Sequence, residues 1–252
     1  MEAMAYPLAV VMVWLTAAIS PIIYYFVGQL VASGPVVGGD YFTFAVIGMV
    51  GQMAMSGALQ SFGSRVDGYV QTGTFETLLV EPVSWRLLPF GIVGWPIVQS
   101  FMNVSVAAVV AVALGINVDV SGLPAAIFIL IMGIAASHAI GVLAASVRVL
   151  SKRSDPILGL YLIAGTVLSG VLFPISVLPE PVRVLSYFFP LTYVLAATRK
   201  VLMPGGDLVT GPSALEAVIL LLVFLVVVYP IALWLFGRAL DYGRKLGVLG
   251  GY

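Results

Sequence analysis

The sequence predicts an all-α integral membrane protein with six transmembrane helices. Hydrophobic residues make up 61% of its 252 residues and charged residues only 9%, whereas an average soluble domain carries about 25% charged residues. Six apolar runs are each long enough to cross a hydrocarbon core of about 30 Å at about 1.5 Å per helical residue. The runs are continuous and do not alternate in polarity, so helices are expected and a transmembrane barrel is excluded.

The expected spans occupy most of the chain, so residues 1–252 are predicted to form a single membrane domain. The first run lacks a preceding basic residue and is longer than the roughly 7–15 residues of a signal-peptide core, which predicts a retained span. The six spans are expected at about 8–31, 42–64, 87–114, 124–147, 156–177 and 215–236.

The composition excludes several classes of function. The net charge is zero, which argues against the basic footprint of a nucleic-acid binder. There is no cysteine and only one histidine, His138, so disulfides and thiolate metal sites are excluded and no metal site is expected. The pattern Gly-x-x-x-x-Gly-Lys-Ser/Thr does not occur. The chain is therefore not expected to hydrolyse ATP or to be an enzyme by itself.

Segment 73–84, between the second and third spans, predicts a short amphipathic helix outside the hydrocarbon. Phe75, Leu78, Leu79 and Val83 fall on one helical stripe. The segment is too short to span a bilayer and carries two carboxylates, Glu76 and Glu81. From the pattern alone, a lipid-surface anchor and a docking site for a partner protein are both open.

The connection 178–212 differs from the plain turns at 32–40 and 116–122. It is half apolar, and four prolines divide it into two short helical pieces that are expected to dip into the outer leaflet. Such a re-entrant element is stable only where protein covers its backbone. The prolines are Pro179, Pro181, Pro190 and Pro204.

Basic residues predict the orientation, because they are retained in short cytoplasmic loops. Eight of the eleven lie in one set of connections, and the opposite set holds only Arg183, Arg199 and Lys200. Both termini are therefore predicted to be cytoplasmic in a multi-pass plasma or inner membrane protein. The eight are Arg65, Arg86, Arg148, Lys152, Arg153, Arg238, Arg244 and Lys245.

Polar residues inside the spans make a second candidate site. An amide that faces lipid is costly, so polar faces are expected to turn toward protein or a wet cavity. Two interpretations stay open: hydrogen bonds between helices, worth about 0.6 kcal/mol each, and a substrate path. The residues are Gln52, Ser56 and Gln60 in the second span, Gln99 and Asn103 in the third, and His138 in the fourth. His138 is either a structural residue or a proton relay.

Two strings resemble the type-2 permeases of ABC exporters, the group that includes daunorubicin-type drug exporters and polysaccharide exporters. The first is Gly73-Thr74-Phe75-Glu76-Thr77-Leu78-Leu79-Val80-Glu81-Pro82-Val83-Ser84. The second runs from Ser169-Gly170-Val171-Leu172-Phe173-Pro174 through Leu178-Pro179 and Phe189-Pro190-Leu191-Thr192-Tyr193 to Arg199. The six-span layout is similar as well, so the resemblance covers nearly the whole chain.

The resemblance implies a coupling helix at 73–84 that docks on a separate ATPase subunit, which would bind ATP and Mg²⁺. Implied docking residues are Gly73, Thr74, Phe75, Glu76, Leu78, Leu79, Glu81, Pro82, Lys152 and Arg153. Glu81 departs from the family pattern and predicts a basic residue on the partner. An extracellular re-entrant hairpin before the sixth span is implied as well, with Pro174, Pro179, Pro190, Thr192, Tyr193 and Arg199.

The resulting hypothesis is an ATP-driven exporter subunit that pairs with an identical or homologous permease and two ATPase subunits. Few charges lie in the spans, which favours efflux of a hydrophobic or amphipathic substrate such as an antibiotic, another drug or a lipid. Antibiotic resistance is the physiological role this would imply. The alternative is a stand-alone secondary carrier or channel that uses the polar faces and His138; no inverted repeat of the kind common in carriers is evident between residues 1–114 and 124–236.

Overall fold

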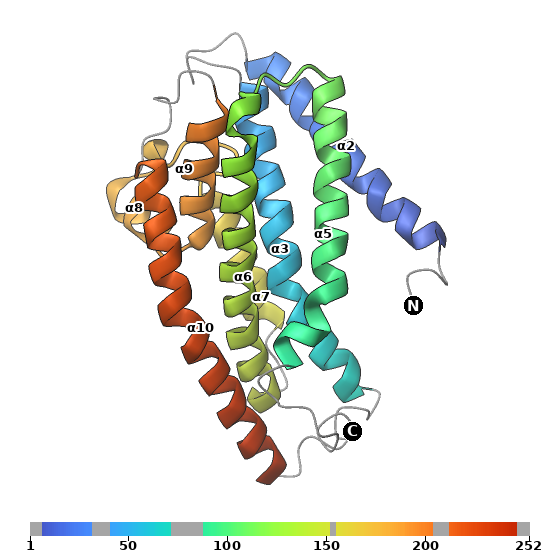
Figure 1. Ribbon diagram of the computed structural model, residues 1–252, viewed down its shortest axis with the longest axis vertical. Helices are drawn as coiled ribbons and strands as arrows, with labels where there is room; N and C mark the ends of the chain where they lie inside the picture. Colours follow the sequence, from blue (N-terminus) through green and yellow to red (C-terminus); the bar gives the residue numbers. More distant parts are fainter. Residues whose placement is uncertain (1–6, 32–40, 72–87, 152–154, 204–211, 246–252) are drawn as a thin grey trace.

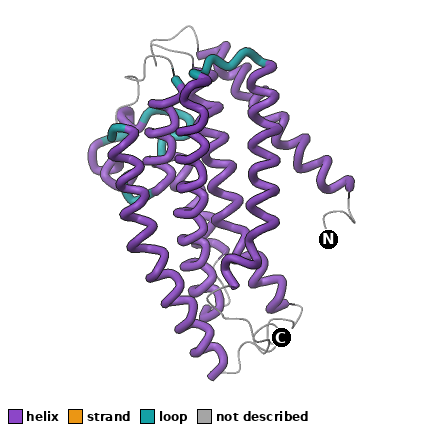
Figure 2. Tube along the Cα trace, viewed as in Figure 1, coloured by secondary structure: helices purple, strands orange, loops and turns teal. Residues whose placement is uncertain are grey.

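The structure is a computed structural model that describes residues 7–31, 41–71, 88–151, 155–203 and 212–245. Within these ranges every regular element is helical, and the long helices run side by side along the long axis of the molecule (Figures 1 and 2). Five of them are long and apolar enough to cross a membrane. They are α2 (Pro7–Val31), α3 (Tyr41–Gln71), α5 (Leu88–Ala113), α6 (Leu123–Ser151) and α10 (Ala214–Lys245). The predicted all-α membrane fold is confirmed.

The predicted fifth span, 156–177, is wrong over residues 169–177. Helix α7 covers only Asp155–Leu168, and 14 residues rise about 21 Å, which is less than the hydrocarbon thickness. Gly170 follows with φ +75°, in the left-handed region, and a second stop comes from Pro174, which precedes the 3₁₀ helix η2 (Ile175–Val177). Hydrophobicity continues through this segment, so composition alone could not locate the break.

The connection after α7 folds as the predicted pair of short helices. Helix α8 spans Glu180–Ser186 and α9 spans Pro190–Leu202, each with a proline among its first residues, where the missing N–H costs nothing. Most of α9 is buried, and it packs against α3, α6 and α10. Protein therefore covers the backbone of α9, as a re-entrant element requires.

Helix α6 lies at the centre of the bundle between α3 and α10 (Figure 1). Its small residues permit close approach to neighbouring helices: a Cβ on Gly141 would meet the backbone of Leu59 on α3, and one on Gly133 would meet Val194 on α9. Before α6, the turn contains the 3₁₀ helix η1 (Val120–Gly122). The Asp119 carboxylate accepts hydrogen bonds from the Ser121 side chain and backbone, which keep its pKa below the usual range.

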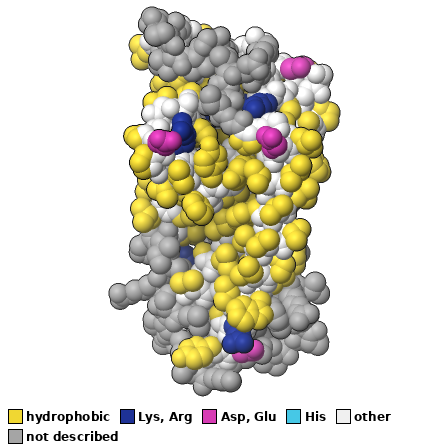
Figure 3. Space-filling model, turned by 90° about the vertical axis from the view of Figure 1, so that its left-hand side faces the viewer, with side chains coloured by type: hydrophobic (Ala, Val, Ile, Leu, Met, Phe, Trp, Pro, Cys, Tyr) yellow, Lys and Arg dark blue, Asp and Glu magenta, His cyan; other side chains and the backbone are white. Residues whose placement is uncertain are grey.

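The outward faces of the helices are apolar over the middle of the bundle. Large exposed side chains include Phe26 on α2, Val109 on α5 and Val226 on α10. In Figure 3 hydrophobic side chains cover the middle of the face, and its acidic side chains lie toward the two ends. This arrangement is that of a protein surrounded by lipid over its middle and by water at its ends.

Candidate functional site

The implied docking residues lie outside the described residues, but the structure describes the four helices that flank them, α3, α5, α6 and α7. α3 ends at Gln71 and α5 begins at Leu88, at the same end of the bundle at which α6 ends and α7 begins (Figure 1). Segments 72–87 and 152–154 therefore both join helices at this end. The residues concerned are Gly73, Thr74, Phe75, Glu76, Leu78, Leu79, Glu81, Pro82, Lys152 and Arg153.

Two of the predicted substrate-path residues, Gln52 and Ser56 on α3, line a groove beside α7. Ser137 of α6 and Tyr161 of α7 add two hydroxyl groups, and the Gln52 amide donates a hydrogen bond to the Thr166 hydroxyl on α7. The rest of the lining is apolar: Met55, Leu59, Leu162, Gly165, Phe189 and Leu191. None of the described residues that line this groove is charged, so its chemistry suits an uncharged or amphipathic molecule.

The other predicted path residues do not join this groove. Gln60 is exposed, and its amide donates to the Ser56 carbonyl of its own helix. Gln99 and Asn103 lie on α5, where Asn103 Oδ1 is buried and makes no hydrogen bond to the described residues. His138 contacts α10. The six residues therefore occupy several places in the bundle.

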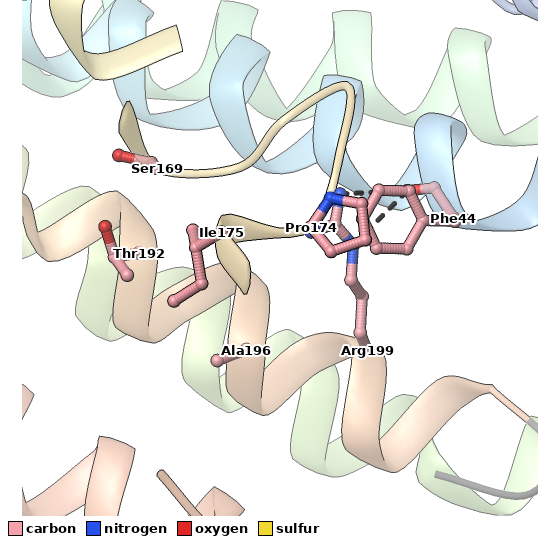
Figure 4. Close-up of a pocket in the computed structure, with 7 residues that line it drawn as sticks. All are labelled: Phe44, Ser169, Pro174, Ile175, Thr192, Ala196 and Arg199. Atoms are coloured by element: carbon pink, nitrogen blue, oxygen red, sulfur yellow. Dashed lines mark hydrogen bonds between the residues drawn. The ribbon is translucent and has the colours of Figure 1, made fainter. Parts of the chain in front are cut away.

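Arg199, near the carboxyl end of α9, makes four hydrogen bonds to backbone carbonyls. Its guanidinium donates to the backbone carbonyls of Phe44 (3.0 and 3.3 Å), Gly170 (2.7 Å) and Val171 (2.9 Å). Its Cζ lies 3.4 Å from the centre of the Phe44 ring. Figure 4 shows the side chain reaching from α9 toward Phe44, beside Pro174. One side chain thus joins α3, the break after α7 and α9.

The positive charge of Arg199 is buried, and no carboxylate of the described residues neutralises it. The residue is only 3% exposed, and among the residues whose placement is described no acidic side chain forms an ion pair with it. Carbonyl dipoles and the negative face of the Phe44 ring stabilise the charge instead. A small cavity beside it is lined by Ser169, Thr192 and Ala196 as well (Figure 4).

Two glycines allow this contact, and the sequence pattern singled out neither for it. A Cβ on Gly48 would overlap the carbonyl oxygen of Val171 and lie 2.6 Å from Arg199 Nη2. Gly170 has a positive φ, which glycine adopts without steric cost. Gly48 lies in an ordinary apolar stretch, so no local signal could have found it.

The remaining hairpin residues hold α8 to α9. Thr192 Oγ1 donates to the Ser186 carbonyl (2.6 Å), and the Tyr193 hydroxyl donates to the Tyr187 carbonyl (2.8 Å). Pro174 and Pro179 precede η2 and α8, and Pro190 begins α9. In the described ranges no cluster of three His, Asp or Glu side chains could hold a metal ion.

Comparison with protein families decides the classification. The family model described as ABC-2 type transporter matches residues 9–203. The chain belongs to the ABC-2 type transporter family. A comparison with curated proteins found no match. As an ABC-2 transporter, the chain is a multi-pass membrane subunit of an ABC transporter, and the family in general works with ABC ATPase subunits. The match ends at Met203, directly after α9, so it includes the groove and the Arg199 contact.

Proposed function

We propose that this ABC-2 subunit exports a hydrophobic or amphipathic molecule, driven by a separate ATPase that docks on segment 73–84. Family membership supports an ABC transporter subunit over a stand-alone carrier or channel. The chain would pair with a second permease, identical or homologous, and with two ATPase subunits in the cell membrane. Both termini and the docking segments would face the cytoplasm, where ATP is available.

The observation that carries the proposed substrate class is the groove between α3 and α7. An amide and three hydroxyl groups stand among apolar side chains, with no charge to be compensated. Binding sites for small amphipathic molecules combine apolar walls with a few polar groups that set the orientation. A charged polymer would find no counter-charge in this lining.

The connections suggest how docking would act on the groove. The end of α3 adjoins segment 72–87, and the start of α7 adjoins segment 152–154. A push by the ATPase on these two segments would therefore move the two walls of the groove. α7 is short and keeps exposed Leu160 and Ile163 on its outer face, so we expect α7 to shift more easily than the central α6.

Docking is tested by charge reversal in segment 73–84. Glu76→Lys combined with Pro82→Ala is expected to abolish substrate-stimulated ATP hydrolysis by the purified complex and to leave membrane insertion unchanged. Insertion is measured by recovery in the membrane fraction and hydrolysis by phosphate release. Exposed Gln60 on α3 provides a matched control, because Gln60→Leu leaves both proposed docking segments, 73–84 and 152–154, unchanged. Full activity of the Glu76 and Pro82 variant contradicts the docking assignment.

The groove is tested with a pair of variants that break the same hydrogen bond. Gln52→Leu and Thr166→Val both remove the bond between α3 and α7, worth about 0.6 kcal/mol, but only Gln52→Leu also removes the amide that lines the groove. We expect similar melting temperatures for the two and a several-fold larger change in apparent substrate affinity for Gln52→Leu. Equal effects of Gln52→Leu and Thr166→Val on transport of a fluorescent amphipathic dye would contradict the assignment of the groove as the substrate site.

A further inference from the structure

The carboxyl-terminal turns of α10 lie at one boundary of the membrane. Residues 217–237 carry no charge, and their rise of about 31 Å matches a hydrocarbon core of about 30 Å. Arg238 is therefore the first charged residue beyond the hydrocarbon, at the depth of the lipid headgroups. In Figure 1 the last turns of α10 extend beyond the end of α6.

One face of these turns is exposed and combines aromatic with charged side chains. Trp234 and Tyr242 are each 56% exposed, and Arg238 and Asp241 between them are exposed as well. Their spacings place the four on one side of the helix. Ile231, which is 48% exposed, continues the same side into the hydrocarbon. Tryptophan and tyrosine are enriched where hydrocarbon meets the headgroups, so a lipid on this face would contact α10 over both regions.

The Arg238 guanidinium leans toward the membrane. Its Cζ lies 4.8 Å from the centre of the Trp234 ring, one turn earlier in the helix, and the negative face of such a ring attracts a cation. Helical side chains point back toward the amino terminus, which for Arg238 is the direction of the hydrocarbon. The ring thus keeps the positive charge at the depth of the lipid phosphate groups.

Arg238 and Asp241, both of them described residues, carry opposite charges three residues apart and do not pair with each other. Glu180 and Arg183 on α8 have the same spacing and do form an ion pair, at 3.9 Å. Among the side chains that the structure describes, neither Arg238 nor Asp241 has an ion-pair partner. The lipid-facing side of α10 therefore presents two separate charges, the positive one deeper in the membrane and the negative one nearer to water.

We propose that this face binds the headgroup of a phosphatidylethanolamine lipid, with the phosphate on Arg238 and the ammonium on Asp241. A guanidinium binds phosphate through two parallel hydrogen bonds, and an ammonium offers three donors to a carboxylate. Cβ atoms three residues apart on a helix are about 5–6 Å from each other, a distance that the short ethanolamine linker can bridge. The inference goes beyond the proposed function, since it involves neither the groove nor a docked ATPase.

The two charges distinguish this headgroup from other common ones. Phosphatidylglycerol would place its phosphate on Arg238 and bring its negative charge close to the Asp241 carboxylate, which repels it. Phosphatidylcholine has a phosphate for Arg238, but its quaternary ammonium has no N–H to donate to Asp241. Phosphatidylethanolamine satisfies both side chains.

Trp234 can report the lipid directly. Replacement of Trp14, Trp85 and Trp95 by phenylalanine leaves Trp234 as the only tryptophan. In phosphatidylcholine nanodiscs that contain a small, fixed fraction of a lipid brominated on its acyl chains, bromine next to Trp234 quenches its fluorescence. We expect brominated phosphatidylethanolamine to quench several-fold more than brominated phosphatidylcholine or phosphatidylglycerol at the same fraction. Equal quenching by the three lipids, or the strongest quenching by phosphatidylglycerol, overturns the proposal.

Variants of this reporter protein test the two charges. Arg238→Gln and Asp241→Asn are each expected to reduce quenching by phosphatidylethanolamine to the level of phosphatidylcholine. Arg238→Asp combined with Asp241→Arg keeps both charges and reverses their depth, so it should lose the preference as well. Glu180→Gln on α8 is the matched control and should keep it. A preference that survives the reversal shows attraction to charge alone and overturns the assignment of the headgroup.

A second measurement keeps all four tryptophans. Native mass spectrometry of the purified chain, titrated with each of the three lipids in detergent, counts the lipids that stay bound. Binding of phosphatidylethanolamine should be several-fold weaker in Arg238→Gln and Asp241→Asn than in the wild type, and unchanged in Glu180→Gln. Melting temperatures near that of the wild type identify folded variants. Unchanged binding of phosphatidylethanolamine in both folded variants overturns the proposal.

Discussion

At the scale of single residues, Arg199 shows how a membrane protein can keep a buried positive charge without an acidic partner. Four hydrogen bonds to carbonyls replace the water that the guanidinium loses. The carbonyls of Gly170 and Val171 are available because the chain after α7 leaves the helical conformation there. The charge and the break in the helix thus stabilise each other: each supplies the partner that the other requires.

We expect Arg199→Lys to be nearly as damaging as Arg199→Met. An ammonium group has three donors around one nitrogen and cannot reproduce the planar fork that reaches three residues, and hydrogen bonds to a charged group are worth about 1.5–3 kcal/mol each. Both variants should lose several kcal/mol of stability and melt at lower temperature in detergent, measured by loss of the monodisperse peak on size-exclusion chromatography. Wild-type melting of Arg199→Lys would contradict the importance of the fork.

The sequence could indicate that Arg199 matters but could not indicate why. The resemblance to the family included the residue, as the end of the second string. Its partners lie 28, 29 and 155 residues away along the chain. Such pairings depend on how the elements pack, and no local periodicity encodes them. The same holds for His138 and Tyr229, which are 91 residues apart.

At the scale of elements, hydrophobicity located the long helices and misjudged their ends. α3 and α10 continue to Gln71 and Lys245, beyond the predicted ends at 64 and 236, because helical hydrogen bonding continues past the apolar stretch. α7 is shorter than the apolar run that predicted it. Hydrophobicity reports on the surroundings of a residue, whereas backbone conformation at Gly170 and Pro174 sets where the helix stops.

The approach of α3 to the Arg199 contact depends on Gly48, which gives a direct test of this packing. Gly48→Ala should destabilise the protein by about 1–3 kcal/mol, because the added methyl overlaps the Val171 carbonyl. Gly68→Ala in the same helix is the matched control: nothing lies within 4 Å of the added atom, and alanine favours the helix by up to about 1 kcal/mol. Equal melting temperatures for the two variants would show that α3 and the turn are not in close contact.

At the scale of the whole molecule, the two ends of the bundle have different characters. One end carries α8, α9 and the tight turn with η1, and the other carries the junctions of α3 with α5 and of α6 with α7. Sequence reasoning assigned these ends to opposite sides of the membrane from the basic residues alone. The docking residues were found only through the resemblance, because a short amphipathic helix is equally compatible with a lipid anchor.

ATPase docking depends on which end of the bundle faces the cytoplasm. Because the chain contains no cysteine, single introduced cysteines can test this orientation directly. Single cysteines replacing Asn117, in the turn before η1, and Lys152, between α6 and α7, should lie on opposite sides of the membrane. In intact cells a membrane-impermeant maleimide should label Asn117→Cys at once and Lys152→Cys only after permeabilisation, because basic residues are retained in the cytoplasm. The cysteine-free parent protein gives the background. The reverse pattern would turn the docking segments outward, where no ATP-driven subunit could reach them.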